Sequence, residues 1–166
     1  MTRKIIAPIA AGVLLAMAGS AQAAQRSTTF QVTANVTNNC LIEADTLDFG
    51  TFDGELDLFS SSDIRVRCTN GTAFNVNLST GSSGSYANRT MVGPGGTLVY
   101  NLFTENTSYS TVWGDATGTT GRLGGAGAGM GSVQTLTVRG RLLASQNTGQ
   151  IDTGAYSDTI TATVVY

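Results

Sequence analysis

Two runs of alternating apolar and polar residues, one near each end of the chain, constrain its fold most. A period of two places successive side chains on opposite faces of a β-strand, so each run predicts an amphipathic strand. In the last run, 156–166, the apolar face comprises Ile160, Ala162, Val164 and Tyr166. In the first run, 28–38, it comprises Phe30, Val32, Ala34 and Val36.

The last run ends with the chain, with no turn and no further strand after it. Its free edge must therefore be covered by an earlier strand, or it stays open to pairing with another chain. We interpret the last run as one wall of an open groove. The first run then fills such a groove on a different molecule.

Residues 1–23 are predicted to be a signal peptide for export. Arg3 and Lys4 precede an apolar stretch, 5–18, and Ser20-Ala21-Gln22-Ala23 ends in a small-residue cleavage pattern. A membrane anchor is the alternative, but the apolar stretch is too short for one, and no later segment is long enough to span a bilayer. About 143 residues remain after cleavage, enough for one domain.

The charge of the exported chain argues against two classes of partner. Without Arg3 and Lys4, seven of the nine basic residues remain against eleven acidic ones, a net charge of −4. All seven are arginines, and the chain has no histidine. A basic surface for nucleic acid is absent, as is a polybasic segment for an anionic membrane.

Cys40 and Cys68 are the only cysteines, and an even pair in an exported chain predicts a disulfide. Closing a loop of that length stabilises the folded state by roughly 3.5 kcal/mol on the chain-entropy treatment. A metal site is the alternative, but too few ligands of the right type accompany the cysteines. We predict no metal and no cofactor.

Short apolar runs separated by turn residues fill the space between the two ends. Alternation over 64–68 and again over 74–78, with Asn70-Gly71 between them, predicts a hairpin that the disulfide ties back to Cys40. Further strands are expected over 89–92, 97–104, 133–143 and, more weakly, 108–113; the strand over 133–143 is expected to be the longest, and the one over 97–104 to be central. No window has helical periodicity. About seven short strands predict an all-β antiparallel sandwich.

Three clusters invite a chemical function, and each has a simpler explanation. The glycine-rich run 124–131 matches no nucleotide-binding fingerprint and predicts a surface loop. The acidic residues between Asp45 and Asp57 lack the spacing of a calcium loop and are read as a solvated face. Arg139 and Arg141 are read as outward side chains beside a bulge rather than an anion site. Without histidine no nucleophilic triad forms, so we expect no enzyme; acid-only hydrolysis is the remaining catalytic alternative.

The ordered set of local sequences resembles the spore coat protein U domain, the family of archaic, Csu-type chaperone–usher pilus subunits. After Cys40 come L-D-F-G-T at 47–51, V-R-C-T-N-G-T at 66–72, R-T-M at 89–91, Y-N-L-F at 100–103, W-G-D at 113–115, L-T-V-R-G-R at 136–141 and G-A-Y-S-D-T-I-T-A-T-V-V-Y at 154–166. The resemblance covers essentially the whole exported chain.

The resemblance implies an incomplete immunoglobulin-like sandwich that a donor strand from another subunit completes. Residues 24–38 would be the donor segment, with Phe30, Val32, Ala34 and Val36 inserted, and 39–166 the pilin domain. Ile160, Ala162, Val164 and Tyr166 would line the acceptor groove. The implied partners are a periplasmic chaperone, an outer-membrane usher and neighbouring pilin subunits, with a final location on the cell surface and a role in attachment and biofilm formation.

Two other functions fit the same residues. A spore or cell-coat component would use the fold without building a fibre. A monomeric secreted module, for carbohydrate for instance, would complete its own sandwich with the strand around Phe30. A tip adhesin would need a second domain, so a shaft or adaptor subunit is the expected role within a pilus.

Overall fold

The computed structural model describes residues 23–105, 107–149 and 151–166. The predicted signal peptide lies outside the described residues except for Ala23. The described chain contains strands and two short 3-10 turns, η1 and η2. Their bounds are β1 Cys40–Ala44, β2 Leu58–Cys68, β3 Ala73–Leu78, η1 Gly81–Ser83, β4 Arg89–Gly93, β5 Gly96–Phe103, β6 Leu123–Ala126, β7 Gln134–Leu142, η2 Ala144–Gln146 and β8 Ala162–Val165.

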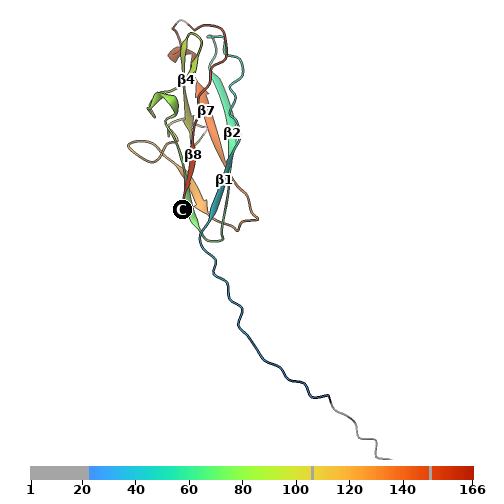
Figure 1. Ribbon diagram of the computed structural model, residues 1–166. Helices are drawn as coiled ribbons and strands as arrows, with labels where there is room; N and C mark the ends of the chain where they lie inside the picture. The colour runs from blue at the N-terminus through green and yellow to red at the C-terminus, as the bar shows by residue number, and fades with distance from the viewer. Residues whose placement is uncertain (1–22, 106, 150) are drawn as a thin grey trace, which may run out of the picture. The chain divides into compact units, whose positions relative to one another are not determined.

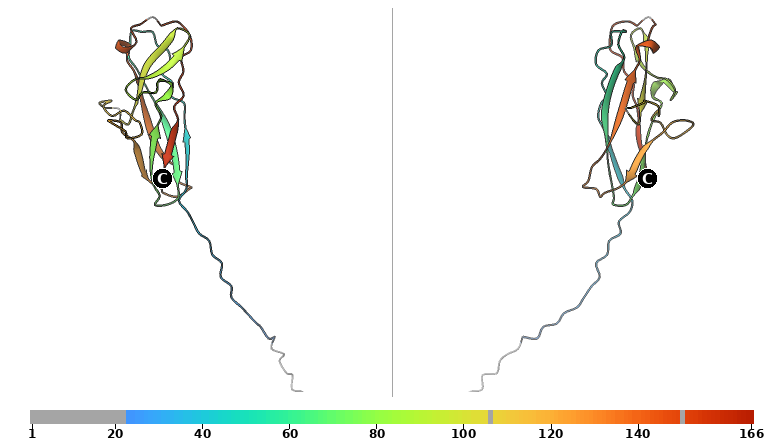
Figure 2. Two further views of the ribbon diagram at one scale, coloured as in Figure 1. Left: turned by 60° about the vertical axis from the view of Figure 1, so that its left-hand side comes forward. Right: turned by 180° about the vertical axis from the view of Figure 1, so that it is seen from behind.

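Two antiparallel sheets make up the body of the protein, residues 36–166 (Figure 1). One sheet has five strands in the order β1-β2-β7-β5-β4, and the other has three in the order β6-β3-β8. The apolar faces of both sheets share one core: Ile64 and Val66 come from β2, and Val76 and Leu78 from β3. Figure 2 shows the strands of the two layers from two further sides. The predicted all-β antiparallel sandwich is confirmed.

Buried polar groups fix the packing inside this core. Trp113 is fully buried, and its indole Nε1 donates to the carbonyl of Val76 at 2.8 Å. Arg89 is also fully buried, and its guanidinium donates to the carbonyls of Ser79 and Trp113 and to Asn101 Oδ1. Burial lowers the pKa of Arg89, although a guanidinium stays protonated in proteins.

The predicted hairpin between 64–68 and 74–78 is wrong. A turn does follow Cys68, and Gly71 has the positive φ that such a turn requires. However, β2 belongs to the five-stranded sheet and β3 to the three-stranded sheet, so the two strands do not pair. A turn signal fixes where the chain reverses but not which strands form hydrogen bonds afterwards.

The glycine-rich run was expected to be a loop, but its first part is a strand. β6 pairs with β3, with Gly124 opposite Asn75 and Gly125 opposite Phe74. A Cβ atom on Gly124 would collide with the Phe74 carbonyl, so this close strand contact requires glycine. The close approach of the β6 and β3 backbones, rather than chain flexibility, explains why glycine is needed in this part of the run.

The remaining strands lie close to where the sequence predicts them, but their lengths differ from the prediction. The predicted central strand is confirmed, since β5 lies between β7 and β4. The longest strand is β2, with 11 residues against 9 in β7, because it pairs with β1 along one part and with β7 along most of its length. In 108–113 only isolated bridges form, at Val112 and Trp113. No helix among the described residues has the length and apolar character needed to cross a bilayer.

Candidate functional site: an open groove along the sandwich

A groove with a volume of about 1240 Å³ runs along the sandwich. Two parts of the chain line it: 44–54, from the last residue of β1 onward, and 147–149 with 151–160 before β8. Core side chains form its interior; among them are Ile64, Leu78, Leu98, Leu102, Val138 and Leu142. These six side chains are only 1–5% exposed, so they form the floor of the groove and not an open surface.

β1 leads into the first of these stretches, and β8 follows the second. Both are terminal strands of their sheets. β1 pairs with β2, and β8 pairs with β3, each on one side. Among the strands that the structure describes, none pairs with the other edge of either. Each therefore presents main-chain N–H and C=O groups that a further strand can pair with.

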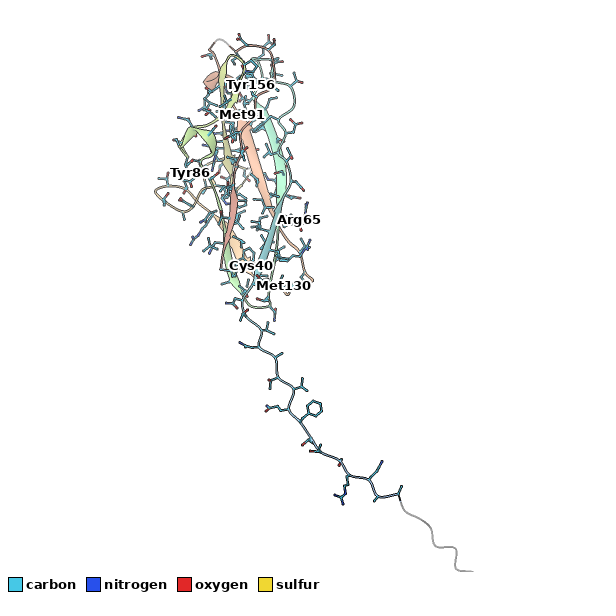
Figure 3. The ribbon with its side chains drawn as sticks, in the orientation of Figure 1. Cys40, Arg65, Tyr86, Met91, Met130 and Tyr156 are labelled. Carbon is cyan, nitrogen blue, oxygen red and sulfur yellow. A yellow bond between two sulfur atoms is a disulfide. The ribbon has the colours of Figure 1, made fainter. Side chains whose placement is uncertain are left out.

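The final strand is shorter than predicted, although its alternation is real. The ladder with β3 covers Ala162–Val165, and the Ser79 N–H, just after β3, continues the pairing by donating to the Thr161 carbonyl at 2.9 Å. Farther back, Ser157 bridges to Val92 of β4 through two main-chain hydrogen bonds of 2.9 and 3.1 Å. The segment before β8 thus passes from one sheet to the other. Tyr156 lies toward one end of the sandwich, and Cys40 toward the other (Figure 3).

The structure places the four predicted acceptor residues in two groups. Ile160 and Ala162 line the groove. Val164 is half-buried and packs against the core, but it does not line the groove. Tyr166 is 54% exposed and is likewise outside the groove lining.

A disulfide between Cys40 and Cys68 anchors the start of β1, whose last residue, Ala44, lines the groove. The two residues are directly opposite each other in the register of β1 and β2, so the covalent bond fixes the first residue of an edge strand. The predicted disulfide is confirmed.

Sequence reasoning gave little weight to the segment that follows β1. Leu47 and Phe49 are partly buried and pack against the core, and the Phe49 ring meets Tyr100 edge to face at 5.9 Å. They fit because Gly140 faces them: a Cβ atom on Gly140 would lie 2.8 Å from Phe49 Cζ and 3.0 Å from Leu47 Cδ2. The alternation of Leu47 and Phe49 was a usable signal, but the complementary Gly140 was not recognisable in the sequence.

One polar pair interrupts the apolar interior of the groove. Tyr100 donates a 2.7 Å hydrogen bond to Asp158, and both residues line the groove. Burial, followed by this hydrogen bond, raises the pKa of Tyr100. Burial opposes ionisation of Asp158, but hydrogen bonds from Tyr100 and from the Ser82 and Thr159 amides outweigh it and lower its pKa. A neutral phenol therefore supports an ionised carboxylate inside the groove.

Asn147 is a second groove residue that the sequence did not single out. Its side chain is buried, accepts a hydrogen bond from Val99 N–H at 2.7 Å and donates to the Val99 carbonyl at 3.0 Å. It therefore satisfies one backbone position of β5 in the way that a neighbouring strand does elsewhere.

The N-terminal unit is described here from residue 23 to residue 35 and has no regular secondary structure. Phe30 and Val32 are 85% and 82% exposed, and Ala34 is exposed as well. Val36, at the start of the other unit, is 82% exposed. All four predicted donor side chains thus present apolar surface to solvent, which is unfavourable unless a partner covers it.

The acidic residues between Asp45 and Asp57 serve local structure. Asp45 accepts from the Arg65 guanidinium, Asp48 from the Gly50 amide and Asp53 from the Glu55 amide. Asp57 accepts from the Ala144 amide at 2.8 Å. In the described part of the chain no group of three or more His, Cys, Asp or Glu side chains is arranged to hold a metal ion.

The antiparallel two-sheet sandwich has the architecture of an immunoglobulin-like domain. The sequence profile of the Spore Coat Protein U domain matches residues 26–163. The chain therefore belongs to the Spore Coat Protein U domain family.

A solved structure shares this fold. It is the pre-assembly complex of the CsuC chaperone with the CsuE tip adhesion subunit, from the archaic chaperone–usher Csu pili of Acinetobacter baumannii. A chain of that complex is 24% identical to this one, with a TM-score of 0.56. The match covers 79% of this chain and 40% of that chain. No curated protein sequence matches the chain.

Proposed function

We propose that this protein is a structural pilus subunit, assembled by the chaperone–usher pathway through donor-strand exchange. The observation that carries the proposal is the groove, because core side chains form its floor, and β1 and β8 beside it each have one edge with no partner among the described strands. A strand inserted there covers the apolar interior and pairs with the main chain of β8, which is the mode of recognition called β-augmentation.

The occupant that fits best is the segment 24–38 of a neighbouring subunit. It offers four apolar side chains at alternate positions, all of them exposed in the chain that carries them. Burying Phe30, Val32 and Val36 at about 1.5–3 kcal/mol each, with a smaller gain for Ala34, gives on the order of 6–9 kcal/mol of gross stabilisation. Hydrogen bonds along the inserted strand add to this and make the link between subunits long-lived.

The domain organisation follows from this assignment. Residues 1–23 direct export, 24–38 donate the strand, and 39–166 form the acceptor body. The donor and the groove are different surfaces of one chain, so the contact is heterologous and propagates as a fibre. Before assembly a periplasmic chaperone covers the groove, and an outer-membrane usher is the site of exchange. The pilus at the cell surface then supports attachment and biofilm formation.

The proposal is tested by supplying the missing strand within one chain. A copy of residues 27–38 is fused after Tyr166 through a short Gly/Asn turn, and the native N-terminal segment is removed. We expect this protein to fold without a chaperone, to stay monomeric and to melt well above the chain without the graft. A linker of a few residues adds little closure entropy, while the graft covers the groove.

Two variants of the graft serve as matched tests. Val32→Asp in the grafted copy places a carboxylate in an apolar groove and should abolish the gain in melting temperature. Thr33→Asp, on the opposite face of the same strand, should retain it. If the chain without the graft is already a stable monomer, or if both variants behave alike, the donor-strand assignment is wrong.

A further inference from the structure

A patch of aromatic and arginine side chains lies on the outer face of the five-stranded sheet, away from the groove. We name it the aromatic–arginine patch and define it by Phe59, Phe103, Tyr109, Arg139 and Arg141. In the strand register Phe59 of β2 is opposite Arg141 of β7, and Phe103 of β5 is opposite Arg139. None of these residues lines the groove. The patch is therefore a separate surface.

The side chains of the patch are stacked on one another. Tyr109 lies 5.3 Å from Phe59 and 5.3 Å from Phe103, measured between ring centroids. The Arg141 guanidinium carbon is 4.8 Å from the Phe103 ring centre and 5.3 Å from that of Tyr109. Phe103 is buried beneath them, whereas Phe59 is 55% exposed. Stacking on the rings fixes the plane of Arg141.

The loop that carries Tyr109 is held in a specific conformation. Tyr109 has a φ of 51°, in the left-handed region that residues other than glycine rarely adopt. The Glu105 carboxylate accepts hydrogen bonds from the amides of Tyr109, Ser110 and Thr111 at 2.7–3.0 Å, and this network keeps the turn in place. Such strain persists where the surrounding structure determines it, and it concentrates at ligand-binding sites.

The charge of the patch contrasts with that of the rest of the protein. The described residues carry seven arginines against eleven acidic side chains. Of these arginines, Arg65 and Arg67 form salt bridges and Arg89 is buried. Arg139 and Arg141 have no carboxylate within 4.0 Å in the described part of the chain, so neither cation of the patch is in an ion pair, although the protein is acidic.

The position of the patch within the sheet limits what it can recognise. At Arg139 and Arg141, β7 pairs with β2 on one side and with β5 on the other, so its main-chain groups there are already paired and cannot receive an added strand. A ligand must therefore be recognised by side chains alone: by stacking on rings and by donation from planar guanidinium groups to a carboxylate.

We propose that the aromatic–arginine patch binds an acidic polysaccharide, with a uronic acid unit as the recognised element. The faces of Phe59 and Tyr109 stack against the apolar face of the sugar ring, and Arg141, with Arg139 beside it, donates hydrogen bonds to the carboxylate. An extended polymer suits a sheet face better than a small molecule does, because each unit contributes little and the chain repeats the contact.

The test measures binding of polygalacturonate to the exported full-length chain by biolayer interferometry, with dextran as a neutral polymer and poly-glutamate as an acidic peptide. We expect polygalacturonate to bind, dextran not to bind, and poly-glutamate to bind at least about tenfold more weakly. Phe59→Ser and Arg141→Gln should each weaken polygalacturonate binding by about tenfold. Arg141→Lys should weaken it too, because lysine keeps the charge but loses the planar stack.

Arg122→Gln is the matched control, because Arg122 is an exposed arginine outside the patch. It should leave polygalacturonate binding within about twofold of the unsubstituted protein. Equal loss in Arg122→Gln and Arg141→Gln, or equal binding of poly-glutamate, would show that net charge alone is recognised and would overturn the proposal. Absence of polygalacturonate binding would overturn it as well. Fluorescence of the buried Trp113 verifies that each variant is folded.

Discussion

Opening the disulfide between Cys40 and Cys68 is expected to destabilise the body and to loosen β1, a terminal strand. The two cysteines are 28 residues apart. On the chain-entropy treatment a closed loop of that length contributes about 3.6 kcal/mol at 25 °C. Because the total stability of a domain is only about 5–15 kcal/mol, this is a large share. For a body of about 130 residues it corresponds to a drop in melting temperature of about 13 °C.

The measurement compares urea unfolding of the strand-grafted protein in its oxidised form, the same protein after reduction, and its Cys40→Ala/Cys68→Ala variant. Trp113 is the single tryptophan and is fully buried, so its fluorescence reports the transition. Reduction keeps both sulfur atoms and isolates the effect of the cross-link. The alanine variant also loses the packing of two buried side chains, so it should be the least stable of the three.

The position of the disulfide adds a local expectation. Cys40 is the first residue of β1, a terminal strand of only five residues. Once the disulfide is reduced, amide hydrogen exchange should accelerate throughout β1, while the amides of the interior strand β7 stay protected until the whole domain unfolds. A loss of less than about 1 kcal/mol on reduction, or equal acceleration in β1 and β7, would refute the view that the cross-link stabilises the body and holds β1 in place.

Two further perturbations test groups inside the body. Arg89→Met should lower the free energy of unfolding by at least about 3 kcal/mol, because two backbone carbonyls and Asn101 lose their buried donors. Arg67→Met at the surface should change it by no more than about 0.5 kcal/mol. Urea unfolding measures both. Hydrogen bonds from the amides of 108–111 lower the pKa of Glu105 to about 2 from an ordinary value of 4.5. Its support of that loop is therefore complete above pH 4.5 and is lost as the pH falls toward 2, which amide exchange will detect; Glu105→Gln should remove this pH dependence.

The sequence predicted the faces of strands better than their partners. Alternation identified the buried residues of β2 and β3, such as Val66 and Val76, because burial depends only on which side of a strand a residue occupies. Pairing depends on where each strand goes after its turn, and the Asn70-Gly71 turn carries the chain from one sheet to the other. Local residues contain no signal for that change of sheet.

In the groove, too, the sequence predicted residues that depend on strand alternation and missed residues that depend on a distant partner. Ile160 and Ala162 were found from their period, because the alternation of burial continues before the regular ladder begins. Gly140 and Asn147 were not found, since each matters through a partner distant in sequence: Phe49 in one case and the Val99 backbone in the other. Reading Gly140 correctly would have required knowing which segment packs over it.

The two surfaces of this domain use different parts of the β-sheet for different kinds of contact. The groove offers unpaired main chain on terminal strands, which suits a link that must be strong and must accept one strand. The aromatic–arginine patch offers side chains that lie outside the groove, so it can hold a ligand without competing for the hydrogen bonds of the link. If both proposals hold, a fibre repeats the patch once per subunit, and a polymer that bridges several subunits dissociates far more slowly than one unit from one patch. Fibres should then retain polygalacturonate longer than the strand-grafted monomer does, while Arg141→Gln should reduce retention by both.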